Sequence, residues 1–159
     1  MTRRKDNGLL HSSGNLELLD LYKVAFLCSR KFPEEAAVKS YRWADEQREK
    51  GICVISGYHS PIERDVLHRL LKGTQPIIIA LAKGLQNLDH ELSAPVETGR
   101  LLIITRYADS VSHACQEKCL QRNRMMIGLA DQIVIAHASA GGNLERLCRE
   151  CDQRKVLRL

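Results

Sequence analysis

The chain has 159 residues, a formal net charge of +5 and an aromatic content of 4%. This length suffices for one domain with a core of its own, and the scarcity of aromatic residues leaves that core to aliphatic side chains and cysteine. We find no secretory signal sequence and no apolar run that could cross a bilayer. We therefore expect a cytoplasmic protein without membrane contact, whose six cysteines are thiols.

The positive charge favours a polyanionic partner, although an excess that is spread evenly over a surface mainly promotes solubility. Proteins that bind nucleic acid concentrate their basic residues on one face. Basic clusters occur here at residues 3–5, 30–31, 122–124 and 154–158, and their positions in the sequence leave open whether they share a face.

The first residues are polar and include Asn7-Gly8 and Ser12-Ser13-Gly14. Segments of this kind fray at chain ends. We therefore expect residues 1–20 to form a flexible basic leader and residues 21–159 to form a single domain. A nucleic-acid-binding arm at the N-terminus is the less favoured alternative.

The rest of the chain alternates between short apolar runs and amphipathic stretches. The apolar runs predict strands at 24–28, 52–56, 76–81, 101–105 and 132–136, with a short final strand at 156–157. The helices are expected at 33–50, 61–72, 86–92, 112–129 and 144–151. Continuously apolar strands are buried on both faces. This order predicts an α/β fold, a three-layer Rossmann-like sandwich with a mostly parallel sheet and helices on both faces.

Two of these helices carry clear end signals. Ser60-Pro61-Ile62-Glu63 matches a capping box, with serine at the cap, proline at the first helical position and glutamate at the third. Pro33 with two following glutamates begins the helix that Gly51 ends.

Ligands of such sheets bind beyond the carboxyl ends of the strands. Ser29-Arg30 and Ser56-Gly57 end two of the predicted strands, and His137 ends the strand that leads into the turn Ser139–Gly142. A strand, a glycine turn and a helix N-terminus form an anion site, because free backbone N–H groups and the helix dipole point the same way. A tight turn without a ligand is the alternative.

Arg122, Asn123 and Arg124 are expected at the start of a helix or just before it. Arginine binds phosphate through two parallel hydrogen bonds. Helix positions two apart face nearly opposite ways, so we expect one arginine to face the site and the other to pair with a carboxylate. The candidate phosphate- or nucleotide-binding residues are Ser29, Arg30, Ser56, Gly57, Arg122, Asn123, Arg124, Ser139, Gly141 and Gly142.

No metal site and no cofactor is predicted. Cys115/Cys119 and Cys148/Cys151 fall within helical patterns, where cysteine packs as a small apolar residue. We find no catalytic triad, no paired carboxylates and no Walker loop. Glu145 is the one acid expected near the glycine turn, where its default role is that of a helix-start acid.

These blocks resemble the DNA-processing protein A (DprA/Smf) family. The resemblance rests on Arg122-Asn123-Arg124, Gly128-Leu129 and Asp131, followed by a strand and the small loop 139–142. Upstream, residues 24–30 resemble the family's first strand and its Gly-Ser-Arg turn, with Cys28 in the place of the glycine. Residues 54–57, 78–85 and 99–105 resemble its following blocks, so the similarity spans residues 20–158.

The chain departs from the family in two respects. Residues 58–63 replace its Ala-Arg-Gly-Ile-Asp segment, which removes the usual basis for a ligand contact there. The length leaves no room for the helical N-terminal domain or the winged helix that many members carry, so we interpret the chain as a stand-alone, divergent core.

The resemblance implies a bacterial protein that binds single-stranded DNA, helps to load a RecA-type recombinase in DNA-mediated transformation, and forms a homodimer. Single-strand binders stack bases on aromatic rings, and Tyr58, Tyr107 and either Tyr41 or Trp43 are the candidates here. The alternative is a small-nucleotide sensor or a phosphoribohydrolase of the cytokinin-activating LOG type. LOG enzymes carry Pro-Gly-Gly-x-Gly-Thr-x-x-Glu. Only Glu145 could supply the acid here, at a different spacing, so an enzyme ranks second.

Overall fold

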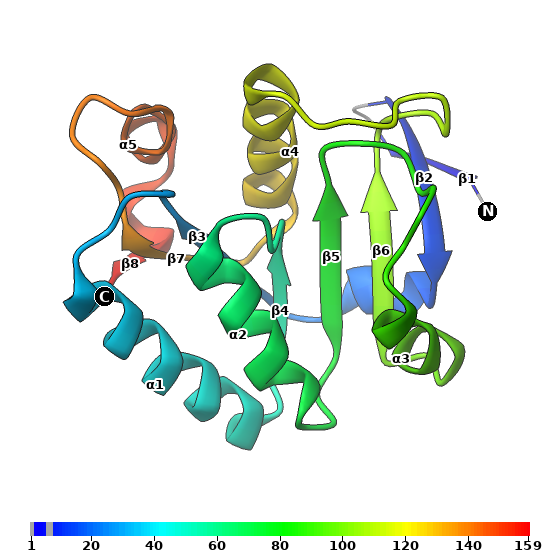
Figure 1. Cartoon of the computed structure of the whole chain (residues 1–159), viewed down its shortest axis with the longest axis horizontal. Coiled ribbons are helices and arrows are strands. Elements are labelled where there is room, and N and C mark those ends of the chain that lie inside the picture. Colours follow the sequence, from blue (N-terminus) through cyan, green and yellow to red (C-terminus); the bar gives the residue numbers. More distant parts are fainter. Residues whose placement is uncertain (1, 6–7) are drawn as a thin grey trace.

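A computed structural model describes residues 2–5 and 8–159. Within them, eight strands form one sheet in the order β1-β2-β6-β5-β4-β3-β7-β8 (Figure 1). The strands are β1 (Thr2–Lys5), β2 (Gly8–Gly14), β3 (Lys23–Cys28), β4 (Cys53–Ser56), β5 (Ile77–Leu81), β6 (Leu101–Thr105), β7 (Gln132–His137) and β8 (Val156–Arg158). The six strands β6-β5-β4-β3-β7-β8 are parallel to one another, while β1 and β2 add an antiparallel edge next to β6.

Helices cover both faces of the sheet. They are α1 (Glu34–Lys50), α2 (Pro61–Leu71), α3 (Ser93–Glu97), α4 (Gln116–Leu129) and α5 (Asn143–Glu150), with 3-10 helices η1 (Leu16–Asp20), η2 (His90–Leu92) and η3 (Gln153–Lys155). One buried cluster joins the sheet to α1, α2 and α3, and a second joins its other face to η1, α4 and α5. The predicted three-layer Rossmann-like fold is therefore confirmed.

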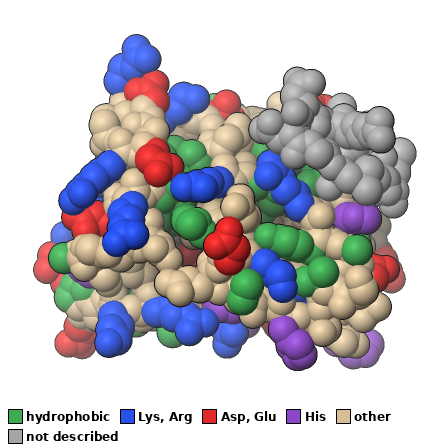
Figure 2. Space-filling view, turned by 90° about the horizontal axis from the view of Figure 1, so that it is seen from above, with side chains coloured by type: hydrophobic (Ala, Val, Ile, Leu, Met, Phe, Trp, Pro, Cys, Tyr) green, Lys and Arg blue, Asp and Glu red, His purple; other side chains and the backbone are tan. Residues whose placement is uncertain are grey.

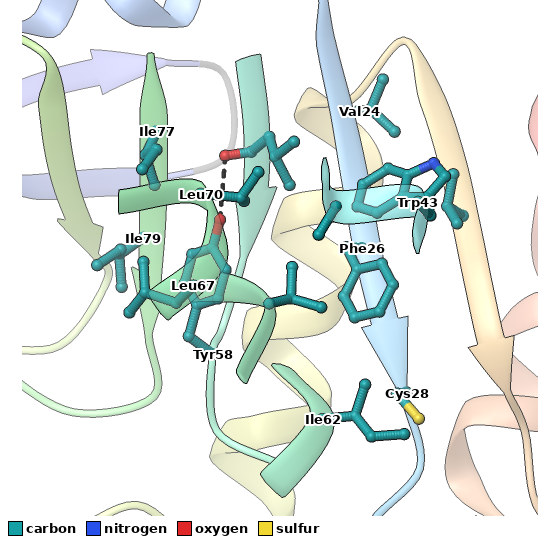
Figure 3. Close-up of a cluster of buried hydrophobic side chains, with 14 of the residues drawn as sticks. Val24, Phe26, Cys28, Trp43, Tyr58, Ile62, Leu67, Leu70, Ile77 and Ile79 are labelled. Carbon is teal, nitrogen blue, oxygen red and sulfur yellow. Dashed lines mark hydrogen bonds between the residues drawn. The ribbon is translucent and has the colours of Figure 1, made fainter. Parts of the chain in front are cut away.

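The first cluster shows how the apolar strands are used (Figure 3). Alternate residues of β3 point to the same face, where Phe26 stacks on Trp43 of α1 with ring centroids 5.0 Å apart. Tyr58 is buried in the same cluster, and its hydroxyl donates to the Val54 carbonyl oxygen at 3.4 Å. Three of the seven aromatic residues are thus committed to the core.

The helix ends follow the signals in the sequence. Ser60 and Glu63 form the predicted capping box of α2, with Pro61 at its first position. Gly51 ends α1 in the left-handed conformation, with φ 71°. Glycine adopts this conformation without a steric penalty, which fixes where the chain turns toward β4.

The N-terminal segment differs from the expected flexible leader. Residues 8–14 form β2, of which residues 11–14 pair with β6, while Leu10, Leu18 and Leu19 are buried. Gly14 lies so close to β6 that an added Cβ would be 2.3 Å from the Leu101 carbonyl oxygen. Residues 1, 6 and 7 and the side chains of the basic cluster at 3–5 lie outside the described part of the chain. So does the nucleic-acid-binding arm that would depend on them.

Two of the predicted helices differ from those in the structure. The helix expected at 86–92 is replaced by η2 and α3, because Asn87 adopts a φ of 58°, which interrupts any right-handed helix. The helix expected from residue 112 begins at Gln116. The loop before it is tied to the loop after β5, where the Gly84 N–H donates to the Val111 carbonyl oxygen at 2.8 Å.

Asp131, one of the residues that resemble the DprA family, has a structural role. Its carboxylate accepts from the Lys23 backbone N–H at 2.8 Å and lies 3.8 Å from the Lys23 ammonium. The same ammonium is buried and donates to the carbonyl oxygens of Leu19 and Leu21. These contacts join β3, β7 and η1 at the end of the sheet opposite to the predicted site.

Among the helices of the described residues, none is both long and apolar enough to span a membrane.

The buried N-terminal segment predicts different effects for two neighbouring leucines. Leu19→Ala should lower the free energy of unfolding by about 3 kcal/mol, because Leu19 is 3% exposed and its removal leaves a cavity. Leu21→Ala is the matched control, since Leu21 is 40% exposed and its removal should cost less than about 1 kcal/mol. Urea denaturation measures both values, and equal effects would show that η1 does not belong to the core.

Candidate functional site

A cavity of about 630 Å³ lies at the carboxyl ends of the central strands. The chain runs from β3 through β4 and β5 to β6 on one side, and then returns to β7 on the other side of β3. Open α/β sheets bind ligands where the strand order reverses in this way. The cavity is lined from the end of β3, the start of α2, α4 and the start of α5. Figure 2 shows this end of the molecule, with Lys and Arg side chains spread over it.

Arg122 is the central basic residue of this cavity. It is only 6% exposed, and its Nε donates to the Asn123 Oδ1 at 2.9 Å. Its guanidinium lies directly on Gly57, where an added Cβ would be 2.4 Å from the guanidinium carbon. Within residues 2–5 and 8–159, no carboxylate forms an ion pair with it. A buried positive charge without an acidic partner is therefore available to an anionic ligand.

Arg124 lies outside the cavity. It is exposed and forms an ion pair with Glu150 of α5 at 3.6 Å. The structure therefore separates the two arginines as the helical spacing predicts. The expected position was wrong, however, because both lie in the middle of α4 rather than at its start.

The glycine turn is closed by its own contacts. The Gly141 N–H donates to the Glu145 carboxylate, and the Gly142 N–H donates to the Ser139 carbonyl oxygen at 3.0 Å. The Ser139 N–H donates to the Ser29 hydroxyl at 3.0 Å. These three N–H groups are therefore not free for a ligand, contrary to the expectation. At the start of α5, Asn143 and Leu144 line the cavity instead.

The two serine-containing strand ends have different roles. Ser29 lines the cavity and joins the ends of β3 and β7 through Ser139. Ser56 is fully buried, and its hydroxyl donates to the Phe26 carbonyl oxygen at 2.8 Å and accepts from the Tyr58 N–H. Ser56 thus fixes the loop after β4 and does not line the cavity, which removes it from the candidate ligand contacts.

Glu63 forms the floor of the cavity. It is 5% exposed, and its carboxylate accepts from the backbone N–H groups of Cys28, His59 and Ser60 at 3.0 to 3.1 Å. These bonds join the end of β3 to the start of α2. Burial and the Glu63 charge raise the pKa of the Cys28 thiol to about 12, so the thiol stays neutral.

His59 contacts Arg30 at the edge of the cavity. Arg30 Nη2 and His59 Nε2 are 2.9 Å apart, and an arginine can only donate, so Nε2 accepts and the ring proton lies on Nδ1. Burial lowers the pKa of His59, and nearby arginine charges lower it further, namely those of Arg122, Arg30 and Arg64. Glu63 acts in the opposite direction.

Other candidates lie outside this arrangement. All six cysteines are free thiols, and no group of three or more His, Cys, Asp or Glu side chains among the described residues could hold a metal ion. His137 contributes its backbone carbonyl oxygen to the Ser29 N–H. Tyr58 and Trp43 are buried, and Tyr41 donates to Asp65. Among the described residues proposed for base stacking, Tyr107 alone is partly exposed and has neither a side-chain hydrogen bond nor a ring contact.

His59 and Glu63 line the cavity, although neither was predicted as a site residue. The available signal was the capping box, because a glutamate that caps the helix after β4 must lie beside the carboxyl ends of the strands. His59 follows from the same signal, since it lies between the end of β4 and the cap residue.

The arginines around His59 predict a measurable change in its titration. Replacing Arg122 with methionine should raise the pKa of His59, because a positive charge that opposes protonation is removed. Arg124→Met is the matched control and should leave that pKa unchanged, since Arg124 pairs with Glu150 outside the cavity. NMR titration of the histidine ring measures both. A pKa that is unchanged in the Arg122 variant would show that the guanidinium does not lie beside His59.

The fold and the family are found in known proteins. DNA processing protein A from Helicobacter pylori, whose structure was described for its single-stranded DNA binding mode, matches with a TM-score of 0.76 and 20% identity over 98% of this chain and 74% of that one. DprA from Streptococcus pneumoniae matches with a TM-score of 0.73 and 23% identity over 94% of this chain and 54% of that one. At these identities the likeness shows the fold alone.

A molybdenum cofactor binding protein from Rippkaea orientalis shares the core more distantly, with a TM-score of 0.58 and 12% identity over 87% of this chain and 77% of that one. No curated protein matches the chain. The model of the family described as DNA recombination-mediator protein A matches residues 4–156, so the chain belongs to that family.

Proposed function

We propose that the protein binds single-stranded DNA and holds a backbone phosphate in the cavity at Arg122. The observation that carries this proposal is the buried guanidinium on Gly57, which has no acidic partner in the described chain. Burial strengthens a charge-assisted hydrogen bond, because water competes less for the donor groups. Asn123 holds the guanidinium through Nε, which leaves its two terminal nitrogens for a phosphate.

Family membership supports this ligand. The relative from Helicobacter pylori binds single-stranded DNA, and we propose the same class of ligand for this chain. The further family role, loading a RecA-type recombinase during DNA-mediated transformation in the bacterial cytoplasm as a homodimer, is part of the proposal and depends on DNA binding.

The aromatic residues predict that phosphate contacts dominate the binding. Base stacking contributes about 1–3 kcal/mol for each base in proteins that use it. Because Tyr58 and Trp43 belong to the core, little stacking is available here. We therefore expect an affinity that depends strongly on salt and little on base sequence.

The cavity volume favours a small nucleotide as the second candidate ligand. Small-molecule sites occupy about 300–1,000 Å³, and the cavity of about 630 Å³ lies in that range. A hydrolase of the LOG type is less well supported, because Glu145 accepts from the Gly141 N–H and pairs with Arg149 at 3.0 Å. Its contacts are those of a helix-start acid.

Binding of a fluorescent oligothymidylate at low and moderate salt tests the proposal by fluorescence anisotropy. Arg122→Ala should weaken binding by about 10-fold to 100-fold, which corresponds to the loss of a hydrogen bond to a charged group. Arg124→Ala removes the same charge from an exposed ion pair and should change the affinity by less than about threefold. Equal losses in both variants, or binding that ignores salt, would contradict a phosphate site at Arg122.

Thermal stability in the presence of AMP separates the two candidate ligands. A small-nucleotide sensor should be stabilised by AMP at concentrations well above its dissociation constant, and Arg122→Ala should abolish the shift. A DNA-binding module should be stabilised more by an oligothymidylate than by AMP at equal phosphate concentration. A large shift with AMP and none with the oligonucleotide would favour the sensor.

A further inference from the structure

A second cavity, of about 520 Å³, lies over the start of α2. It is lined by Arg30, His59, Pro61, Arg64, Asp65 and His68. We propose that Arg30, Arg64 and His59 form a second phosphate subsite there, so that the ligand is a polynucleotide with at least two phosphates rather than a mononucleotide. This inference rests on the proposed function, because it extends the phosphate site at Arg122.

The two cavities are neighbours that share one pair of lining side chains. Arg30 and His59 line both of them and lie 2.9 Å apart, so together they form the wall that the cavities share. A strand that leaves the first cavity on this side must pass over that wall. Arg30 can then turn its guanidinium from His59 to a phosphate, because guanidinium donors prefer an anion to a neutral nitrogen.

The basic residues converge on a single point. Arg122, Arg30 and Arg64 come from α4, the loop after β3 and α2, and each of them opposes the protonation of His59. Within the described chain, none of the three forms an ion pair with a carboxylate. Like charges that lie close together without ion-pair partners repel one another, and a polyanion reduces that cost.

Several other basic residues of α1 and α2 do have acidic partners. Arg69 and Asp45 are 2.8 Å apart, and Lys39 and Glu35 are also 2.8 Å apart. His68, at the far side of the second cavity, lies 3.4 Å from Glu91. Arg122, Arg30 and Arg64 form no such pair within the described structure.

Asp65 is the acid that faces the second cavity. Its Oδ2 accepts from the Tyr41 hydroxyl at 2.6 Å, which holds the carboxylate toward α1. Two arginines face this single carboxylate, so the cavity keeps an excess of positive charge.

A series of ligands of increasing length tests the second subsite. Thymidine monophosphate, the dinucleotide pTpT and longer oligothymidylates compete for the labelled oligonucleotide at fixed salt, in the full chain and in its variants. The original protein should bind the longer ligands more tightly than the monophosphate. Arg64→Ala should weaken the longer ligands about fivefold to tenfold and leave the monophosphate unchanged.

The salt dependence gives a second readout. Each phosphate contact that is lost should reduce the slope of log affinity against log salt by about 0.7 for a single strand. Arg64→Ala should show this reduction with oligonucleotides. Arg42→Ala is the matched control, because Arg42 is exposed on α1 and lines neither cavity. The control removes the same charge and should leave the slope unchanged.

The outcomes separate the two proposals. If Arg122→Ala weakens every ligand and Arg64→Ala behaves like Arg42→Ala, the first site stands and the second subsite is overturned. If Arg122→Ala weakens no ligand, the proposed function itself fails. If Arg64→Ala weakens the monophosphate as strongly as the oligonucleotides, the two cavities form one site, which also overturns the inference.

Discussion

The Arg122 guanidinium can lie at the end of β4 because Gly57 has no side chain. Any Cβ at that position would lie 2.4 Å from the guanidinium carbon, so only glycine lets the arginine lie on the end of β4. Packing against Gly57, rather than an ion pair, thus positions the guanidinium, and its charge remains available to a ligand. The Ser-Gly block after one strand and the Arg-Asn-Arg block of α4, which are far apart in the sequence, serve this single contact.

The acid beneath the site organises the loops without neutralising the cations. Glu63 uses its lone pairs on three backbone N–H groups, so its charge fixes the end of β3 to the start of α2. Cys28 occupies the position where the family has glycine, and its pKa of about 12 keeps the thiol neutral. A thiolate there would have added a negative charge to a site for anions. The neutral Cys28 thiol therefore leaves the positive charge of the cavity unchanged.

The sequence predicted those features that depend on short-range patterns. The run at 101–105 has one reasonable interpretation, a strand buried on both faces, and the cap at Ser60 specifies a helix start from four residues. The polar segment that forms β2 was missed, because its strand conformation depends on pairing with β6. The Asp6-Asn7-Gly8 sequence was the available hairpin signal. The closed glycine turn could not be predicted either, because it depends on the rotamer of Glu145.

The distribution of ion pairs says more about the partner than the net charge does. A charge of +5 on 159 residues is compatible with simple solubility. Arg69 and Lys39 nevertheless form ion pairs with acids, whereas the three arginines around His59 form none within the described chain. Burial is the main cause of the lowered pKa of His59, and the charges of these three arginines lower it further. Three like charges that lie this close together carry an electrostatic cost. Perturbed titration of this kind concentrates at functional sites. A polyanion that lies across both cavities would remove the cost, and this argues for a strand of nucleic acid over a single nucleotide.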